Sequence, residues 1–128
     1  MQNNKPNANE YSPLALAYMG DAVFEILVRD MVLSRGNMPA NKLHKTSKGY
    51  VNAAAQAAMY MKLEAIVTEE EHAVMKRGRN AKSYTTAKNQ SVTDYRHATG
   101  LEALFGYLYL KGEKERIREL FEICVKDM

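Results

Sequence analysis

Apolar residues recur every three or four positions along most of this chain, and this periodicity limits the folds open to it. The spacing is that of the inward face of an amphipathic α-helix. No segment shows sustained strand-type alternation between hairpin turns, and no internal repeat is visible. The sequence therefore predicts an all-α protein whose core is built from packed helical faces.

Two helices are predicted in the first half of the chain. Ser12-Pro13 has the residues of a helix start, and the apolar pattern then continues to Gly36. After a Pro-containing break a second amphipathic helix is expected, with Lys42, Lys45 and Lys48 largely outside its apolar stripe. The residues of that stripe are Leu43, Ser47, Tyr50, Val51, Ala54, Ala58 and Met61.

The second half predicts a capped helix, a basic loop and two further helices. Thr68 to Glu71 fits a capping box, so its consecutive acids are interpreted as a helix start and not as a metal site. The periodicity fades after Met75, which predicts a basic loop from Lys76 to Thr86. Helical spacing resumes near Asp94 and stops at Gly112, and a last helix with paired charges on its outer face follows.

The composition fits one soluble domain. The chain has 128 residues, 46% of them hydrophobic, which suffices for one ordinary core but not for two. Residues 1–11 are expected to form a flexible N-terminal tail, and residues 12–128 a single domain. No signal-peptide pattern is visible, and no run reaches the roughly 20 apolar residues of a membrane span. The single cysteine, Cys124, excludes an internal disulfide and suits a reducing, cytoplasmic setting.

Two short runs each place one carboxylate on an apolar helical face. Asp21 lies within Tyr18 to Val23, and Glu102 lies within Ala98 to Gly106. The positions three and four residues from each acid are mainly packing residues, so both acids are predicted to face inward. A carboxylate withdrawn from water needs a partner, and no Lys or Arg shares either stripe.

Small residues beside both acids would allow two helices to approach closely, so that the acids meet across the crossing. Repulsion there would raise the pKa of one acid or attract a divalent cation. Oxygen ligands favour Mg²⁺, with Mn²⁺ as a substitute, and one Cys with three scattered His offers no zinc site. The alternative is that each acid is a structural hydrogen-bond partner or a cap. The small residues are Ala17, Gly20, Ala98, Gly100 and Gly106.

The basic residues are unevenly distributed. Two stretches, Met31 to Leu63 and Lys76 to Thr93, contain no Asp or Glu and hold ten of the 18 Lys and Arg residues. This distribution favours a polyanionic partner, although two solvated helix faces would give the same composition. The ten are Arg35, Lys42, Lys45, Lys48 and Lys62 in the first stretch, and Lys76, Arg77, Arg79, Lys82 and Lys88 in the second.

The two acidic runs resemble the ribonuclease III family. Tyr18 to Val23 is similar to the core of the family's signature helix, and Leu101 to Gly106 to its later Glu-bearing helix, in the same order and at a matching separation. The segment from Leu43 to Asn52 resembles the basic segment between them. The chain leaves no room for a separate double-stranded-RNA-binding domain, so it looks like the Mini-ribonuclease III group, which is reduced to the catalytic domain.

This resemblance implies a Mg²⁺-dependent, homodimeric endonuclease of double-stranded RNA. Asp21 and Glu102 would be both the catalytic residues and the metal ligands, with Mg²⁺ activating water for attack on a phosphodiester. The family's other acids are replaced here by Ala17, Leu14 and Thr99, so waters and phosphate oxygens would complete the coordination. The implied role is maturation of 23S ribosomal RNA precursors, with help from a ribosomal protein or the pre-ribosome.

Duplex RNA is recognised through its shape, its phosphates and its 2′-hydroxyls. Contacts are therefore expected from the predicted basic loop and from the second helix. Asn80 and Tyr84 are expected either to form a turn and pack or to touch ribose or phosphate, the first role being favoured. Glu25 is a candidate outer residue of the metal site or a surface ion-pair partner. The expected basic contacts are Arg77, Arg79, Lys82, Lys88, Lys42, Lys45 and Lys48.

Three other functions fit part of the sequence. A non-catalytic, ribosome- or RNA-associated helical binding module would use the basic stretches but not the acids. An all-α metal-dependent hydrolase of nucleoside triphosphates would need several acids at helical spacing. A structural dimerisation domain would leave the basic stretches unexplained. The first of these predicts that Asp21→Asn leaves function intact.

Overall fold

The computed structural model describes residues 6–82 and 91–128, and helices are its only regular elements there. A short 3-10 helix, η1 (Ala8–Glu10), precedes six α-helices. These are α1 (Pro13–Leu33), α2 (Ala40–Lys48), α3 (Ala53–Glu64), α4 (Glu69–Asn80), α5 (Val92–Lys111) and α6 (Lys114–Val125). The predicted all-α class is confirmed. In the two described ranges, none of the helices is long and apolar enough to cross a membrane.

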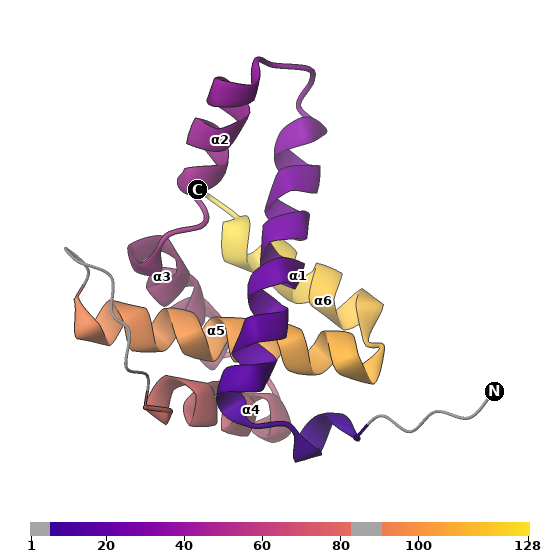
Figure 1. Ribbon diagram of the computed structural model, residues 1–128, viewed down its shortest axis with the longest axis vertical. Coiled ribbons are helices and arrows are strands. Elements are labelled where there is room, and N and C mark those ends of the chain that lie inside the picture. Colours follow the sequence, from indigo (N-terminus) through magenta and orange to yellow (C-terminus); the bar gives the residue numbers. More distant parts are fainter. Residues whose placement is uncertain (1–5, 83–90) are drawn as a thin grey trace.

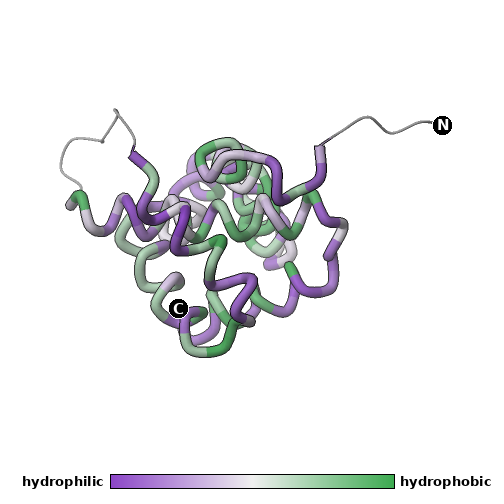
Figure 2. The backbone as a smooth tube through the Cα atoms, turned by 90° about the horizontal axis from the view of Figure 1, so that it is seen from below, coloured by the Kyte–Doolittle hydropathy of each residue, from purple (hydrophilic) through white to green (hydrophobic). Residues whose placement is uncertain are grey.

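Helix α5 is the centre of the structure. It runs across the middle of Figure 1, with α1 crossing it upright, and it packs against α1, α3, α4 and α6. Phe24 of α1 makes edge-to-face contacts with Phe105 of α5 and Phe121 of α6, with ring centroids 5.6 Å apart in both pairs. Figure 2 shows hydrophobic positions of the helices gathered inside and hydrophilic ones along the outside. One core cluster therefore fixes the crossing of α1 over α5.

The predicted helix boundaries at Ser12, Thr68 and Gly112 are confirmed. The Ser12 hydroxyl accepts a hydrogen bond from the Ala15 backbone N–H at 3.1 Å. Thr68 and Glu71 exchange the two hydrogen bonds of a capping box. Gly112 ends α5 with φ 78°, a left-handed conformation that glycine adopts without steric cost.

The acidic triplet at the start of α4 ties this helix to α5 and α6. Glu71 accepts hydrogen bonds from Arg116 at 2.8 and 2.7 Å, and this carboxyl is buried. The Arg116 guanidinium holds the pKa of Glu71 below its usual value. Glu70 accepts hydrogen bonds from Tyr107 and Lys111 of α5. The interpretation of the triplet as a helix start and not a metal site is consistent with these contacts.

The predicted second helix is in fact two helices. Helix α2 ends at Lys48, and Asn52 begins α3 by accepting a hydrogen bond from the Ala55 backbone N–H at 2.8 Å. This turn rotates the buried face, because a helical period continues only within one helix. The predicted stripe is therefore wrong in α3, where Ala54, Ala58 and Met61 are exposed while Met59, Tyr60 and Leu63 are buried.

The predicted basic loop is wrong in its first part, since α4 continues through Lys76 to Asn80. The reason is the packing of Gly78, a residue that the sequence pattern places in the loop. A Cβ atom at this position would lie 2.7 Å from the Ala103 Cβ and 2.9 Å from the Gly100 Cα. Gly78 is thus a contact point between α4 and α5, and this packing outweighs the low helix propensity of glycine.

The N-terminal segment is partly packed. Residues 7–11, which were assigned to a flexible tail, include η1, whose start is capped by Asn7. Ala8 is 8% exposed and belongs to the core cluster, and η1 contacts α5. A loose tail therefore does not describe these residues.

Candidate active site

The crossing of α1 and α5 brings two glycines into backbone contact. A Cβ atom at Gly20 would lie 1.6 Å from the Glu102 carbonyl oxygen, and one at Gly106 would lie 1.9 Å from the Leu16 carbonyl oxygen. No side chain fits between the helices here. The predicted close crossing is therefore present, formed by Gly20 and Gly106, whereas Gly100 packs against α4 instead.

Asp21 and Glu102 meet beside this crossing. The two carboxyl groups lie close enough that the charge and the hydrogen-bonding capacity of Asp21 both raise the pKa of Glu102. Glu102 is half-buried, but Asp21 is exposed, so the prediction that both acids face inward is wrong for Asp21. Gly20 occupies the seam between the helices, which places the next residue at its solvent edge. Neither acid forms an ion pair with a Lys or Arg of the described residues.

Burial and the Asp21 charge together raise the pKa of Glu102 to about 8. Burial is the larger cause, and the nearby Gln56 amide opposes it by lowering the pKa. The Gln56 Nε2 atom is itself buried and makes no hydrogen bond of ordinary geometry to the part of the chain that the structure describes. At neutral pH the acid pair therefore holds a proton that a cation would displace.

The raised pKa predicts a pH-dependent stability. The unfolded chain releases the Glu102 proton near 4.5, whereas the folded protein keeps it to about 8, so in this window the unfolded state binds fewer protons. In a chelator, the free energy of unfolding should therefore fall by about 2 to 4 kcal/mol as pH rises from about 5 to about 8. Urea denaturation of wild type and Glu102→Gln measures this, with a flatter profile expected for the variant. Parallel profiles would contradict it.

Asp21 lines a surface hollow on α1. A space of about 340 Å³ is lined by Tyr18, Met19, Asp21, Ala22 and Glu25. Glu25 forms an ion pair with Arg29 at 3.3 Å, so it has the surface partner that was one of its two expected roles. No group of three or more His, Cys, Asp and Glu side chains gathers as a metal site in the described ranges. The donor set is therefore two carboxylates in contact, which suits an oxygen-preferring divalent cation whose other ligands are water or substrate.

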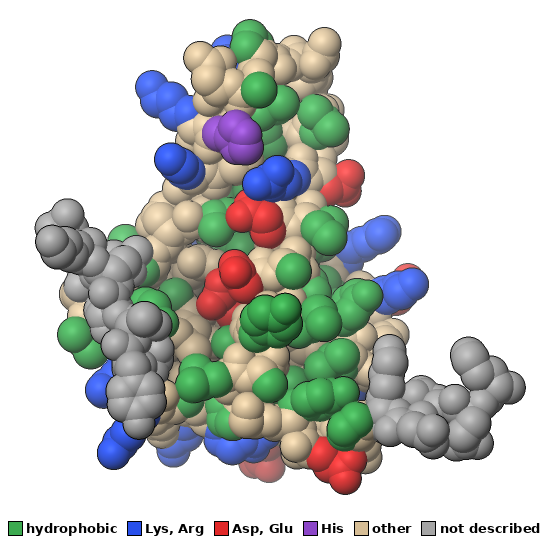
Figure 3. Space-filling view, in the orientation of Figure 1, with side chains coloured by type: hydrophobic (Ala, Val, Ile, Leu, Met, Phe, Trp, Pro, Cys, Tyr) green, Lys and Arg blue, Asp and Glu red, His purple; other side chains and the backbone are tan. Residues whose placement is uncertain are grey.

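The structure places most of the predicted RNA contacts on two surfaces. Lys42, Lys45 and Lys48 are exposed on α2. Arg77 is exposed on α4, Arg79 is half-buried near its end, and Lys82 is exposed just beyond it. Figure 3 shows blue basic side chains above and below the red acidic groups on one face. Lys88 and Tyr84 lie outside the described residues.

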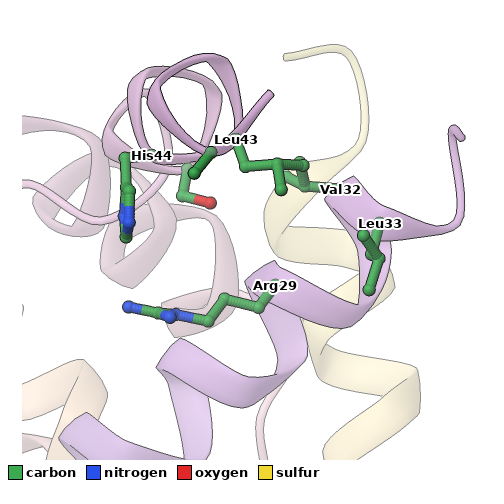
Figure 4. A pocket seen from close by; sticks show the side chains of 7 residues that line it. Arg29, Val32, Leu33, Leu43 and His44 are labelled. Atoms are coloured by element: carbon green, nitrogen blue, oxygen red, sulfur yellow. The ribbon is translucent and has the colours of Figure 1, made fainter. Parts of the chain in front are cut away.

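Two further pockets were not predicted from the sequence. One, of about 250 Å³, is lined by Arg79, Asn80, Thr93, Arg96 and His97. Arg96 and His97 were overlooked because they follow Asp94, just past the acid-free stretch. The other, of about 190 Å³, lies between α1 and α2. Figure 4 shows its apolar Val32, Leu33 and Leu43, with Arg29 and His44 extending toward the same side.

An exposed apolar stripe follows α1 beside the acid pair. Tyr18 is 81% exposed and Ile26 is 68% exposed, and Ala22 lies between them at helical spacing. A hollow of about 300 Å³ extends this surface to Tyr109 of α5 and Ile117 of α6. Green hydrophobic side chains are visible beside the acidic groups in Figure 3. Contiguous apolar patches on a protein surface are typical of interaction sites.

Comparisons with known proteins agree with the fold. The model of the Ribonuclease III domain matches residues 14–113. The Mini-ribonuclease 3 of Enterococcus faecalis is 52% identical, over 88% of this chain and 87% of its own. That of Streptococcus pneumoniae is 40% identical, over 94% and 95%. A crystal structure of a Fusobacterium nucleatum protein, 34% identical, superposes with a TM-score of 0.86 and covers 95% of this chain and 99% of that one.

The all-helical fold and these matches define an endoribonuclease of the ribonuclease III type. The chain belongs to the ribonuclease III family, within its Mini-ribonuclease 3 group.

Proposed function

We propose that the protein is a Mg²⁺-dependent endonuclease of double-stranded RNA in which Asp21 and Glu102 are the catalytic residues and metal ligands. The contact between the two carboxyl groups, unpaired with any basic side chain of the described residues, is the observation that carries this proposal. Leaving two acids together without compensation costs stability, which is expected of a site built to bind a cation.

Asp21 and Glu102 supply the two carboxyl groups that would hold the cation. Asp21 presents a carboxylate at the solvent edge of the crossing, and Glu102 presents one from the half-buried side. Glu102 would hold the cation as a carboxylate, because a nearby positive charge would oppose the effect of Asp21 and lower the pKa of Glu102. When bound, Mg²⁺ supplies activation of water and stabilisation of charge on the phosphate. Mn²⁺ would be expected to substitute, because it also prefers oxygen ligands.

The two basic surfaces would bind the phosphates of the RNA duplex. Lys42, Lys45 and Lys48 are exposed on α2, and Arg77, Arg79 and Lys82 lie at the end of α4 or just beyond it. A duplex crossing the acid pair would meet both groups through its phosphates, without base-specific contacts. The acid pair disfavours a helical module that only binds RNA, since such a module has no use for two carboxyl groups that no basic side chain of the described residues compensates.

The apolar stripe of α1 supports a twofold homodimer. Its side chains lie next to Asp21, so a symmetric contact through Tyr18, Ala22 and Ile26 would bring two acid pairs into one assembly. Each pair would then cut one strand, giving products with 5′-phosphates and short 3′ overhangs. We further propose that the natural substrate is the 23S ribosomal RNA precursor in the cytoplasm, with a ribosomal protein or the pre-ribosome helping to position it.

Cleavage of defined RNAs tests this function. Purified protein is incubated with a long RNA duplex, its separate strands and the equivalent DNA duplex, each with Mg²⁺ or with chelator, and product ends are mapped. Cuts confined to the RNA duplex with Mg²⁺ are expected. Binding of the RNA duplex without cleavage under every condition would instead support the non-catalytic RNA-binding module.

The dimer is tested by placing a charge on the apolar stripe. Ile26→Glu is expected to convert a dimer into a monomer in sedimentation velocity, because a buried unpaired carboxylate is costly. Ile66→Glu is the matched control, since Ile66 is a 46% exposed apolar residue in the turn between α3 and α4. A wild-type protein that sediments as a monomer at all concentrations would overturn the dimer.

A further inference from the structure

The pocket between the end of α4 and the start of α5 is built for a small polar group. It has a volume of about 250 Å³ and is lined by Arg79, Asn80, Thr93, Arg96 and His97. Pockets for drug-sized ligands begin at about 300 Å³ and are mainly apolar. This one is smaller, and every side chain that lines it carries a hydrogen-bonding group.

Its positive charge is not compensated. The ion pairs of the described residues are made by Arg29, His72, Lys111 and Arg116, so neither Arg79 nor Arg96 has a carboxylate partner there. The Arg79 Nε atom donates to the Asn80 Oδ1 atom at 3.2 Å, which orients the guanidinium at the pocket. Two guanidinium groups facing one pocket suit a phosphate, which each can bind through paired N–H donors.

A buried tyrosine supports the pocket from the core side. Tyr60 of α3 is 0% exposed, and its ring meets the His97 ring edge-on, with centroids 4.7 Å apart. The Tyr60 hydroxyl is buried and makes no ordinary hydrogen bond within the described ranges. Burial raises the pKa of Tyr60, and the nearby Arg79 opposes that rise, so Tyr60 lies against Arg79 as well as His97. The two pocket residues therefore rest on a rigid, neutral side chain.

His97 presents an acceptor, not a donor. Its Nδ1 atom lies 2.8 Å from the Thr93 carbonyl oxygen, and a carbonyl only accepts, so Nδ1 carries the proton. In the neutral imidazole, Nε2 is then a hydrogen-bond acceptor. A backbone phosphodiester offers only acceptors, and could not donate to this atom. A ribose offers a 2′-hydroxyl that donates, next to its phosphate.

We propose that this pocket is a ribose–phosphate subsite, in which Arg79 and Arg96 bind a backbone phosphate of RNA and His97 Nε2 accepts a hydrogen bond from a 2′-hydroxyl. This proposal rests on the proposed action on duplex RNA and adds the residues by which the chain distinguishes ribose from deoxyribose. Gly100 of α5 packs against the backbone at Arg79 of α4, which joins the two sides of the subsite. Arg96 and His97 lie on α5, the helix that also carries Glu102, about one and a half turns before that residue.

The test is a binding assay without cleavage. Wild type, Arg96→Gln, His97→Ala and His97→Gln are titrated in chelator against two A-form duplexes of one sequence, one with 2′-hydroxyl and one with 2′-fluoro groups. The fluoro duplex keeps the phosphates but lacks the donor. Lys126→Gln, which removes a charge at the end of α6, is the control. Thermal melting confirms that each variant is folded.

Wild type should bind the hydroxyl duplex about 5-fold more tightly than the fluoro duplex. His97→Ala should shrink this ratio, and His97→Gln should restore part of it, since its amide oxygen can accept. Arg96→Gln should weaken both duplexes equally and reduce the slope of log affinity against log salt by about 0.9, the value for one phosphate contact. Lys126→Gln should leave the ratio unchanged.

Two results would overturn the subsite. If RNA binds and is cleaved while the His97 variants keep the wild-type ratio and Arg96→Gln keeps the salt slope, the subsite is wrong and the proposed function stands. If wild type binds neither duplex in chelator nor cleaves RNA with Mg²⁺, the proposed function fails together with the subsite.

Discussion

Asp21→Asn is expected to lower cleavage of duplex RNA by about 1,000-fold or more, while binding of the duplex is retained. The substitution keeps the size of the side chain but removes the charge that would hold the cation. Loss of about 4 kcal/mol of transition-state stabilisation, ordinary for a displaced metal ion, accounts for this factor. Glu102→Gln should have a similar effect, because both carboxylates are needed to bind one ion.

The same variant should be at least as stable as wild type above about pH 8, where both carboxyl groups of the wild-type pair are ionised. Asp21 is one of the two causes that raise the pKa of Glu102, so its neutralisation relieves a repulsion in the folded protein. A loss of activity together with a gain in stability is typical of a functional residue and not of a structural one. Asp30→Asn, an exposed acid on the same helix, is the matched control and should change neither property. Equal losses in both variants would contradict the assignment.

Gly20→Ala should be the most damaging single-methyl change in the chain. The new Cβ atom would lie 1.6 Å from the Glu102 carbonyl oxygen and 2.9 Å from the Gly106 backbone nitrogen, so whole helices must move apart. Overpacking of this kind costs about 1–3 kcal/mol or more, which exceeds the roughly 1 kcal/mol that alanine gains over glycine in a helix. Chemical denaturation should show a net loss of about 2 kcal/mol.

The displacement should also reduce activity beyond the loss of stability. Since Asp21 follows Gly20 directly, helix separation moves its carboxylate away from Glu102, and a misplacement of about 1 Å can cost about 100-fold in rate. The control is Gly49→Ala, where the added Cβ would meet only the Thr46 carbonyl oxygen, at 3.3 Å. An active, fully stable Gly20→Ala protein would mean that the helices do not cross as described.

Local patterns predicted the parts of this site that lie within single helices. The glycines at 20 and 106, beside acids on apolar runs, indicated a close crossing, and Gly20 and Gly106 form it. Periodicity could not show on which side of the seam Asp21 lies, because it counts neighbours along one helix and not across two. The exposure of Asp21 depends on α5, which is far away in the sequence.

The wrong predictions for α3 and α4 have the same cause, because contacts between helices are not visible in a local sequence pattern. Asn is a common residue at a helix start, but the apolar pattern continues on both sides of Asn52, so the start of α3 at this residue was not predicted. Gly78 was assigned to a loop because glycine has a low helix propensity, whereas its contact with Ala103 and Gly100 keeps it in α4. The pocket of Arg79, Arg96 and His97 joins two helices that are separate in the sequence, so no local motif could predict it.

Direct counting of bound Mn²⁺ by electron paramagnetic resonance tests the central claim, that Asp21 and Glu102 together hold the catalytic cation. Wild-type protein is titrated alongside Asp21→Asn, Glu102→Gln and the control Asp30→Asn. One firmly bound ion per chain in wild type and control, and none in the other two variants, is the predicted result. An ion that binds equally to all four proteins would contradict the claim, because the site would then lie elsewhere.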